Sequence, residues 1–320
     1  YLASLLGSYA TCGMAEDTWA LNEGVIDEAA FLEQAYSIFE ERRGMFLNAL
    51  HNTSRGVVAC VFDTSDRVQH MFYRHMGTSD QHTKVIEEMY QRMDTLVGET
   101  LPFVDKNTAL YVLSDHGFTS FRRGVNLNSW LHQHGYLTLL PNASIGGSFF
   151  EGVDWSKTRA YALGLGGMYL NVKGREAQGI VEAGAQAEQL RREIIEKLSE
   201  LREETGEETG AVPIRTVYAT SDLYRGPYLD AAPDFIIGYN EGYRVSWDSA
   251  VGKITGHILE DNEKAWSGDH CVDPTLVPGV LFSNQTINAV DPGIEDLAPT
   301  ALHLFGVDIP KWIEGKSLLT

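Results

Sequence analysis

Two short, mostly apolar runs constrain the fold of this chain more than any other feature. They are GVVACVF at 56–62 and TALYVLS at 108–114. An apolar run of this length, rich in β-branched residues and without polar alternation, predicts a strand that is buried on both faces. Strands of this kind are typical of a parallel sheet that lies between two layers of helices.

Helical patterns surround both runs. The segment DEAAFLEQAYSIFEERRGMFLNAL at 27–50 has apolar residues at helical spacing and an acidic start, and 66–76 and 83–101 continue the helical pattern. A short helix, NLNSWLHQHG, follows the second run. This alternation predicts an α/β fold with a mainly parallel sheet, covered by helices on both faces.

The rest of the chain divides into a less regular middle and an α/β end. Residues 141–180 are rich in glycine, 187–206 predict a charged, exposed helix, and DFIIGY at 234–239 predicts a strand. We interpret 141–260 as a cap inserted within one domain that spans 1–320. LVPGVLFSN then predicts a strand, and IEDLAPTALHLFGV predicts a helix with Pro299 near its start.

The composition excludes several classes of partner. The net charge is -19, from 25 basic and 44 acidic side chains, and so negative a surface repels nucleic acid and anionic lipid. No apolar run approaches the roughly 20 residues needed to span a bilayer. The three cysteines form no CxxC pair, which suits a reducing compartment and predicts a cytoplasmic protein of unspecified oligomeric state. An anionic substrate would then need local positive charge from a metal or from arginines.

Candidate ligands lie where the two predicted strands end. Asp66 follows the first run, and Asp115 and His116 follow the second. Ligands of α/β sheets bind at the carboxyl ends of the strands. Asp66 and His70 are four residues apart, so in a helix they share a face and can hold one ion. Taken alone, each pair has an ordinary interpretation. Asp66 and His70 could be a solvated Asp and a surface His, and Asp115 could be a loop residue that caps the next turn.

A third element is SGDH at 267–270, which contributes His270. A lone His is more often structural than a ligand. Together, however, the three segments supply two carboxylates and three imidazoles, all beside apolar strands. Mixed Asp and His ligation suits Zn²⁺ or Mn²⁺.

Two arginines follow His116 in FRRG. On an acidic protein, Arg122 and Arg123 could clamp a phosphate or a carboxylate of the substrate. An equally good interpretation is one buried ion pair and one solvated arginine.

Three segments, VFDTSDRVQH, LSDHGF and WSGDH, occur in that order. They resemble the metal-ligand segments of the alkaline phosphatase superfamily, and most closely its type I phosphodiesterase/nucleotide pyrophosphatase-like group of predicted phosphohydrolases and phosphomutases. The similarity runs from about Phe31 to the C-terminus. By this resemblance, Asp66, His70 and His270 hold one divalent ion, while Asp115 and His116 supply half the ligands of a second.

The resemblance also implies a small-molecule phosphate ester as substrate and a Ser or Thr nucleophile. In the family, that nucleophile follows a strand that ends in Asp, and this chain shows neither. Asp17 and Thr18 have no apolar strand before them. We therefore expect an N-terminally incomplete domain, with exposed strand edges and with little or no activity on its own.

Two other interpretations stay open at this point. One is a non-catalytic or regulatory domain that keeps the metal-binding loops without turnover. The other is a sulfatase-like hydrolase, which would need a modified Cys or Ser nucleophile, and the sequence shows no such site.

Overall fold

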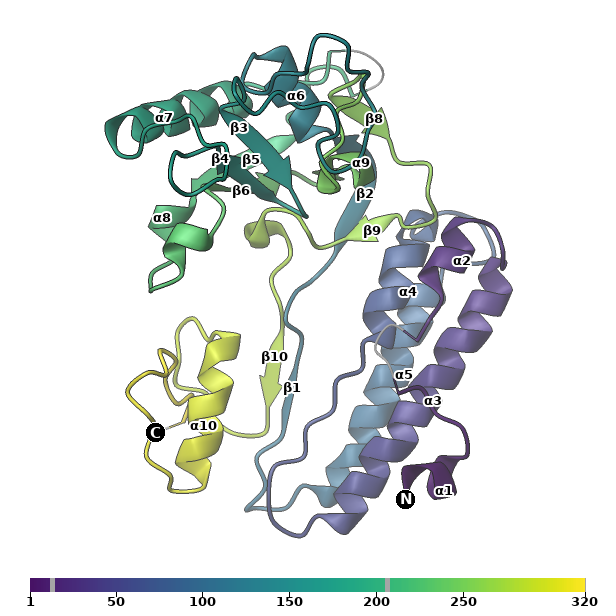
Figure 1. Ribbon diagram of the computed structural model, residues 1–320. Helices are drawn as coiled ribbons and strands as arrows, with labels where there is room; N and C mark the ends of the chain where they lie inside the picture. The colour runs from purple at the N-terminus through teal and green to yellow at the C-terminus, as the bar shows by residue number, and fades with distance from the viewer. Residues whose placement is uncertain (12–14, 205–207, 320) are drawn as a thin grey trace. The chain divides into compact units, whose positions relative to one another are not determined.

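The computed structural model describes residues 1–11, 15–204 and 208–319 and divides into two compact units (Figure 1). The first unit comprises Tyr1–Gly117 and Pro278–Thr320, and the second comprises Phe118–Val277. Of the three cysteines, Cys12 lies outside the described residues, whereas Cys60 and Cys271 are free thiols.

Helices dominate the first unit (Figure 1). They are α1 (Leu2–Leu6), α2 (Thr18–Asn22), α3 (Glu28–Asn52), α4 (Thr64–Phe72), η1 (Tyr73–His75), α5 (Val85–Thr100), η2 (Leu101–Phe103), η5 (Ile294–Asp296) and α10 (Leu297–Leu304). The helices predicted at 27–50, 66–76, 83–101 and near Pro299 are therefore confirmed. Asp27 caps the longest of them, because its Oδ1 accepts a hydrogen bond from the backbone N–H of Ala30 at 2.8 Å.

The core of the first unit lies between α3, α4 and α5. Phe31 of α3 and Phe72 of α4 are fully buried, with ring centroids 6.1 Å apart. Met71 of α4 and Met89 of α5 are buried as well. Burial of such side chains stabilises each by about 1.5–3 kcal/mol relative to exposure. This packing fixes α4, the helix that carries two of the predicted ligands.

The first apolar run differs from its prediction. Residues 56–62 form no strand and are mostly exposed, with Val61 78% exposed, so the predicted buried strand is wrong. The reason is that no strand among the described residues pairs with this segment. An isolated extended segment gains nothing from its β propensity, which reflects packing against neighbouring strands.

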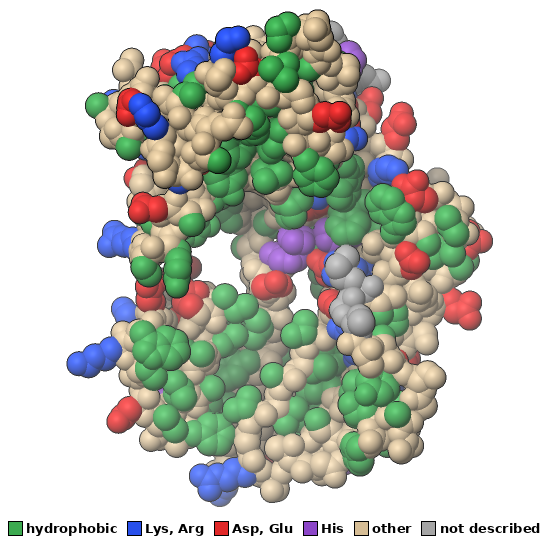
Figure 2. Space-filling view, viewed as in Figure 1, with side chains coloured by type: hydrophobic (Ala, Val, Ile, Leu, Met, Phe, Trp, Pro, Cys, Tyr) green, Lys and Arg blue, Asp and Glu red, His purple; other side chains and the backbone are tan. Residues whose placement is uncertain are grey.

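The second run does form a strand, but a short one. β1 (Tyr111–Leu113) pairs antiparallel with β10 (Leu281–Ser283), which confirms the strand predicted in LVPGVLFSN. This two-stranded sheet has two outer edges that no described strand covers; the edges expected from a missing strand stay a prediction. Figure 2 shows hydrophobic side chains on the surface around the C-terminal segment of this unit. Phe282 and Trp312 are among the exposed hydrophobic residues of the unit.

One of the two four-stranded sheets of the second unit is antiparallel. Its strands follow the order β3 (Ala160–Leu163), β4 (Gly167–Leu170), β6 (Phe235–Tyr239) and β5 (Ile214–Ala219). Helix α7 (Ala185–Ser199) packs against β5 and buries Leu190, Ile194 and Leu198. The strand predicted at DFIIGY and the helix predicted at 187–206 are confirmed, although one face of this helix is buried rather than exposed.

A second sheet carries Arg122 and Arg123 and includes the strand that precedes His270. Its order is β7 (Gly242–Val245), β2 (Thr119–Val125) and β8 (Leu259–Asp261), and β9 (Gly268–Asp269) also pairs with β2. The short helices of this unit are α6 (Leu127–Gln133), α8 (Thr220–Leu223), η3 (Leu229–Ala231), α9 (Trp247–Ala250) and η4 (Pro274–Leu276).

The α/β class is therefore correct, but the predicted mainly parallel sheet is not. The sheets are small and mostly antiparallel, and among the described strands only β2 and β7 pair in parallel. The physical reason is connectivity. A parallel sheet needs helical crossovers between paired strands, and the segment at 56–62 that would begin such a crossover is unpaired. The cap predicted at 141–260 lies within the second unit and stays a prediction. No helix in the described part of the chain is long and apolar enough to cross a bilayer.

Candidate metal centre

Helix α4 brings the first two predicted ligands together. Asp66 and His70 lie one helical turn apart, and Asp66 Oδ1 is 3.4 Å from His70 Nε2. His70 is buried, whereas the carboxylate of Asp66 is partly accessible. Two contacts fix the start of this helix. Thr64 donates a hydrogen bond of 2.8 Å to the buried carboxylate of Glu16, and Arg42 of α3 pairs with Asp63.

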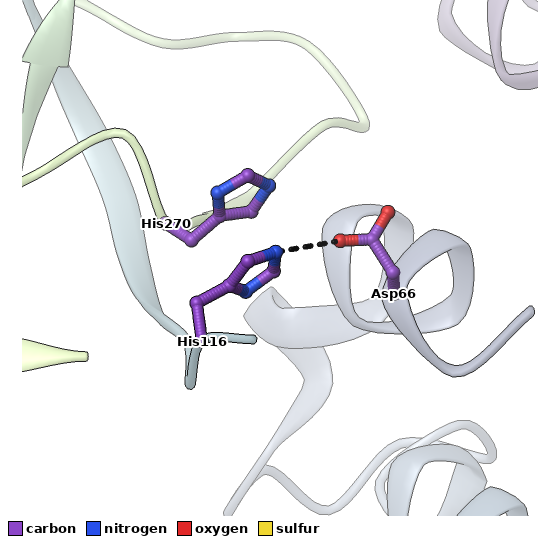
Figure 3. A group of neighbouring side chains, drawn as sticks. All are labelled: Asp66, His116 and His270. Atoms are coloured by element: carbon purple, nitrogen blue, oxygen red, sulfur yellow. Dashed lines mark ion pairs between the residues drawn. The ribbon is translucent and has the colours of Figure 1, made fainter. Parts of the chain in front are cut away.

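His116 reaches the same carboxylate from the end of β1. Its Nε2 lies 3.9 Å from Asp66 Oδ1 (Figure 3) and 3.7 Å from Asp115 Oδ2. Its other ring nitrogen, Nδ1, lies 3.0 Å from the carbonyl oxygen of Gly117. A carbonyl only accepts, so Nδ1 is the donor in this contact and Nε2 is the nitrogen that faces the carboxylates. An imidazole nitrogen beside carboxylate oxygens is an arrangement that suits a metal ion.

Arg67 sets the orientation of the Asp66 carboxylate. Its guanidinium donates to Asp66 Oδ2 at 2.6 Å. The other oxygen, Oδ1, is the one that faces the imidazoles of His70 and His116. A hydrogen-bonded partner of this kind orients a carboxylate ligand and is commonly found around metal sites.

The spacing of these donor atoms fits a small divalent ion. Zn²⁺ bonds of about 2.0–2.1 Å in a tetrahedron separate two ligand atoms by roughly 3.3–3.4 Å. Asp66 Oδ1 and His70 Nε2 lie at this separation, and a donor set of nitrogen and oxygen suits Zn²⁺ or Mn²⁺. His116 is slightly farther away, and the Asp115 side chain is 70% exposed and able to turn. The first unit therefore offers imidazole and carboxylate groups as candidate ligands, and their binding of an ion stays a prediction.

His270 belongs to the second unit and follows β9. Its imidazole and the Phe118 ring pack edge to face, with ring centroids 5.4 Å apart. Ligand atoms of Asp269, His270 and Cys271 lie within 4.8 Å of one another. Burial, with a further contribution from Asp269, raises the pKa of the Cys271 thiol to about 12, so this thiol is protonated at neutral pH. His270 is the ligand that this loop offers most readily, and its sharing of an ion with Asp66 and His70 stays a prediction.

The two predicted substrate-binding arginines lie in β2 in different environments. Arg123 donates from Nε and from a terminal nitrogen to both carboxylate oxygens of the buried Glu203, at 2.7 and 2.9 Å, and also to Asp261. Hydrogen bonding to Glu203 raises the pKa of Arg123 above its ordinary value. Arg122 is exposed and pairs with Glu208 at 3.1 Å. The binding of substrate by either side chain stays a prediction.

The sequence did not single out three residues that shape these sites. Arg67 and Asp269 are sequence neighbours of predicted ligands, and their positions beside Asp66 and His270 were the available signal. Arg244, which pairs with Asp269 at 2.8 Å, gave no signal, because only the pairing of β7 and β9 with β2 brings it near.

This chain is similar to one protein family and to solved structures of one enzyme. The family model described as "Type I phosphodiesterase / nucleotide pyrophosphatase" matches residues 14–268, and a search of curated protein sequences finds no significant match. Among solved structures, wild-type alkaline phosphatase PafA is 14% identical, with a TM-score of 0.45, over 91% of this chain and 53% of that chain. A mutant of the same enzyme gives a TM-score of 0.43 with the same identity and coverage. The chain thus spans about half the length of these structures. Because the family model covers most of its residues, the chain belongs to the type I phosphodiesterase/nucleotide pyrophosphatase family.

Proposed function

We propose that this chain is the metal-binding part of a phosphohydrolase, phosphodiesterase or phosphomutase that acts on a small-molecule phosphate ester. Family membership supports the class of reaction. The observation that carries the proposal is Asp66 Oδ1, which faces the imidazoles of His70 and His116 at 3.4 and 3.9 Å. Carboxylate and imidazole donors at these separations are suited to a divalent ion.

Two ions, Zn²⁺ or Mn²⁺, would be held by five side chains. Asp66, His70 and His270 hold the first, and Asp115 and His116 supply ligands to the second. When bound, two such ions polarise phosphoryl oxygens and activate a nucleophile.

The surrounding residues prepare this site. Arg67 holds Asp66 Oδ2 and so keeps Oδ1 directed at the imidazoles. Burial of His70 keeps its ring in one orientation. Arg122, which is exposed, is the better placed of the two arginines to bind a phosphate oxygen, because the guanidinium of Arg123 already binds two carboxylates.

No residue of this chain is proposed as the nucleophile, so we expect the chain alone to bind metal with little or no turnover. Titration calorimetry with Mn²⁺ or Zn²⁺ alone tests the metal site. Asp66→Ala and His70→Ala should each weaken binding by at least tenfold, while Asp94→Ala, which removes an exposed carboxylate of α5, should not. Unchanged binding by Asp66→Ala would contradict the proposed site.

An activity assay with a nitrophenyl phosphate ester and Mn²⁺ separates the catalytic interpretation from the non-catalytic one. Binding without turnover agrees with our expectation for this chain. Turnover that Asp66→Ala abolishes would show that the chain is catalytic alone, and the expected inactivity would be wrong.

A further inference from the structure

Asp269 is a buried carboxylate with an unusually complete set of partners. Its side chain is 1% exposed. Oδ1 accepts hydrogen bonds from the backbone N–H groups of His270 and Cys271, each at 2.8 Å. Oδ2 accepts from the indole Nε1 of Trp266 at 2.8 Å and lies 2.8 Å from Arg244 Nε. Oδ1 therefore has two donors, and Oδ2 has one donor and a cationic neighbour, which leaves Asp269 poorly suited to bind an ion itself.

Arg244 is the counter-ion that makes this burial tolerable. It is 2% exposed, and an unpaired carboxylate at such depth would be strongly unfavourable. The guanidinium is held in turn by aromatic rings. Its central carbon lies 4.2 Å from the ring centroid of Trp247 and 5.1 Å from that of Phe121. Arg244 thus has a fixed position, set by β7, β2 and α9.

The indole of Trp266 completes the arrangement. Its ring meets that of Trp247 edge to face, with centroids 5.8 Å apart. Trp247 therefore contacts both the guanidinium and the indole that bind Asp269. The carboxylate is therefore tied to its own loop and, through Arg244, to β7, β2 and α9, which is more support than a loop turn requires.

The hydrogen bonds of Asp269 also fix the backbone of His270. A single carboxylate oxygen that accepts the N–H groups of two successive residues fixes the backbone at the point where the imidazole begins. The Phe118 ring restrains the imidazole from another side. We propose that Asp269, held by Arg244, is a positioning residue that fixes the loop so that His270 presents its imidazole to the metal. This inference rests on the proposed function, in which His270 is a ligand.

Asp269→Asn is the most direct test. The variant keeps the shape and one acceptor oxygen but places an N–H group against donors of Arg244 and Trp266. Removal of a hydrogen-bonded partner of a metal ligand typically costs about 10–100-fold in metal affinity. We expect a loss of that size for Zn²⁺ alone in titration calorimetry. We also expect altered Co²⁺ absorption bands, since these report ligand geometry and not stability.

Asp273→Asn is the matched control. Asp273 is equally buried in the same segment, but its oxygens accept from Thr275 and Tyr218. The control should lower the thermal stability while the Zn²⁺ affinity and the Co²⁺ bands stay as in the unmodified chain. An equal effect of both variants on the Co²⁺ bands would overturn the proposal.

The other outcomes are also decisive. A folded Asp269→Asn variant with unchanged Zn²⁺ affinity and Co²⁺ bands overturns the positioning role. If that variant does not fold, Arg244→Lys replaces it, since it keeps the charge but loses Nε and the planar stack, and the same readouts apply. Unchanged Zn²⁺ affinity in His270→Ala would instead overturn the proposed function, because His270 would then be no ligand.

Discussion

Arg122 and Arg123 are sequence neighbours, yet replacing each by Ala should affect a different property: Arg123→Ala should lower stability, and Arg122→Ala should weaken phosphate binding. Arg123 makes a bidentate ion pair with Glu203. The side chain of Glu203 is 2% exposed and that of Arg123 is 18% exposed. Arg123→Ala would leave that carboxylate buried without its partner. Arg122→Ala removes an exposed pair with Glu208.

The magnitudes follow from burial. Removing one partner of a buried ion pair costs about 3–5 kcal/mol, and the partial exposure of Arg123 places the expected loss near the lower value, about 3 kcal/mol. For a unit of this size, each kcal/mol shifts Tm by about 2–4 °C, so Arg123→Ala should lower Tm by roughly 6–12 °C. An exposed pair contributes at most about 1 kcal/mol, so Arg122→Ala should change Tm far less.

Thermal unfolding followed by circular dichroism measures this difference. The double variant Arg123→Met with Glu203→Leu is the informative control, since replacing both partners of a buried pair is often neutral, and it should recover most of the loss. Calorimetry with inorganic phosphate and Mn²⁺ should show weaker binding only for Arg122→Ala. A Tm of Arg123→Ala within 2 °C of the unmodified chain would refute the reasoning.

Three further variants test other features. Tyr239→Phe should raise stability by up to about 1 kcal/mol in urea unfolding, because the hydroxyl is buried with no partner among the described residues; a loss above 1 kcal/mol would contradict this. The hydrogen bond from His75 lowers the pKa of Asp80 to about 2. The ionised carboxylate of Asp80 therefore stabilises the fold above pH 3.8, the ordinary pKa of this group, and this stabilisation is lost as the pH falls toward 2. The stability difference between the unmodified chain and Asp80→Asn should therefore shrink over this range; a constant difference would count against it. Val61→Lys should change stability by less than about 0.5 kcal/mol, as at an exposed position; a loss of several kcal/mol would show that the segment is buried.

The helices could be predicted because their signals are local. Apolar side chains at helical spacing and an acidic start at Asp27 were enough for α3, and the capping hydrogen bond to Ala30 is the contact that such a start predicts. The same holds for Asp66 and His70, since a separation of four residues places two side chains on one face of any helix. For these residues, the sequence determines the geometry without knowledge of distant partners.

Strands depend on partners that the sequence pattern does not show. Both apolar runs have the composition of buried strands, yet 56–62 is unpaired and β1 is only three residues long. The partner of β1 is β10, almost 170 residues away in the chain, and its antiparallel direction reversed the prediction of a parallel sheet. A run of Val and Phe indicates affinity for a sheet but not which strand supplies the neighbouring hydrogen bonds.

The same distinction applies to the candidate metal site. The candidate ligands could be singled out from the sequence, because metal chemistry demands His and Asp and because they follow recognisable segments; their binding of an ion stays a prediction. The groups that orient them divide into two kinds. Arg67 and Asp269 act on their own sequence neighbours, so a search for charged residues beside predicted ligands would have found both. Arg244 acts through Asp269 across a sheet, with aromatic rings of Phe121 and Trp247 as its support. Its position depends on the meeting of β7, β2 and α9, so no local sequence pattern could have placed it beside the loop that carries His270.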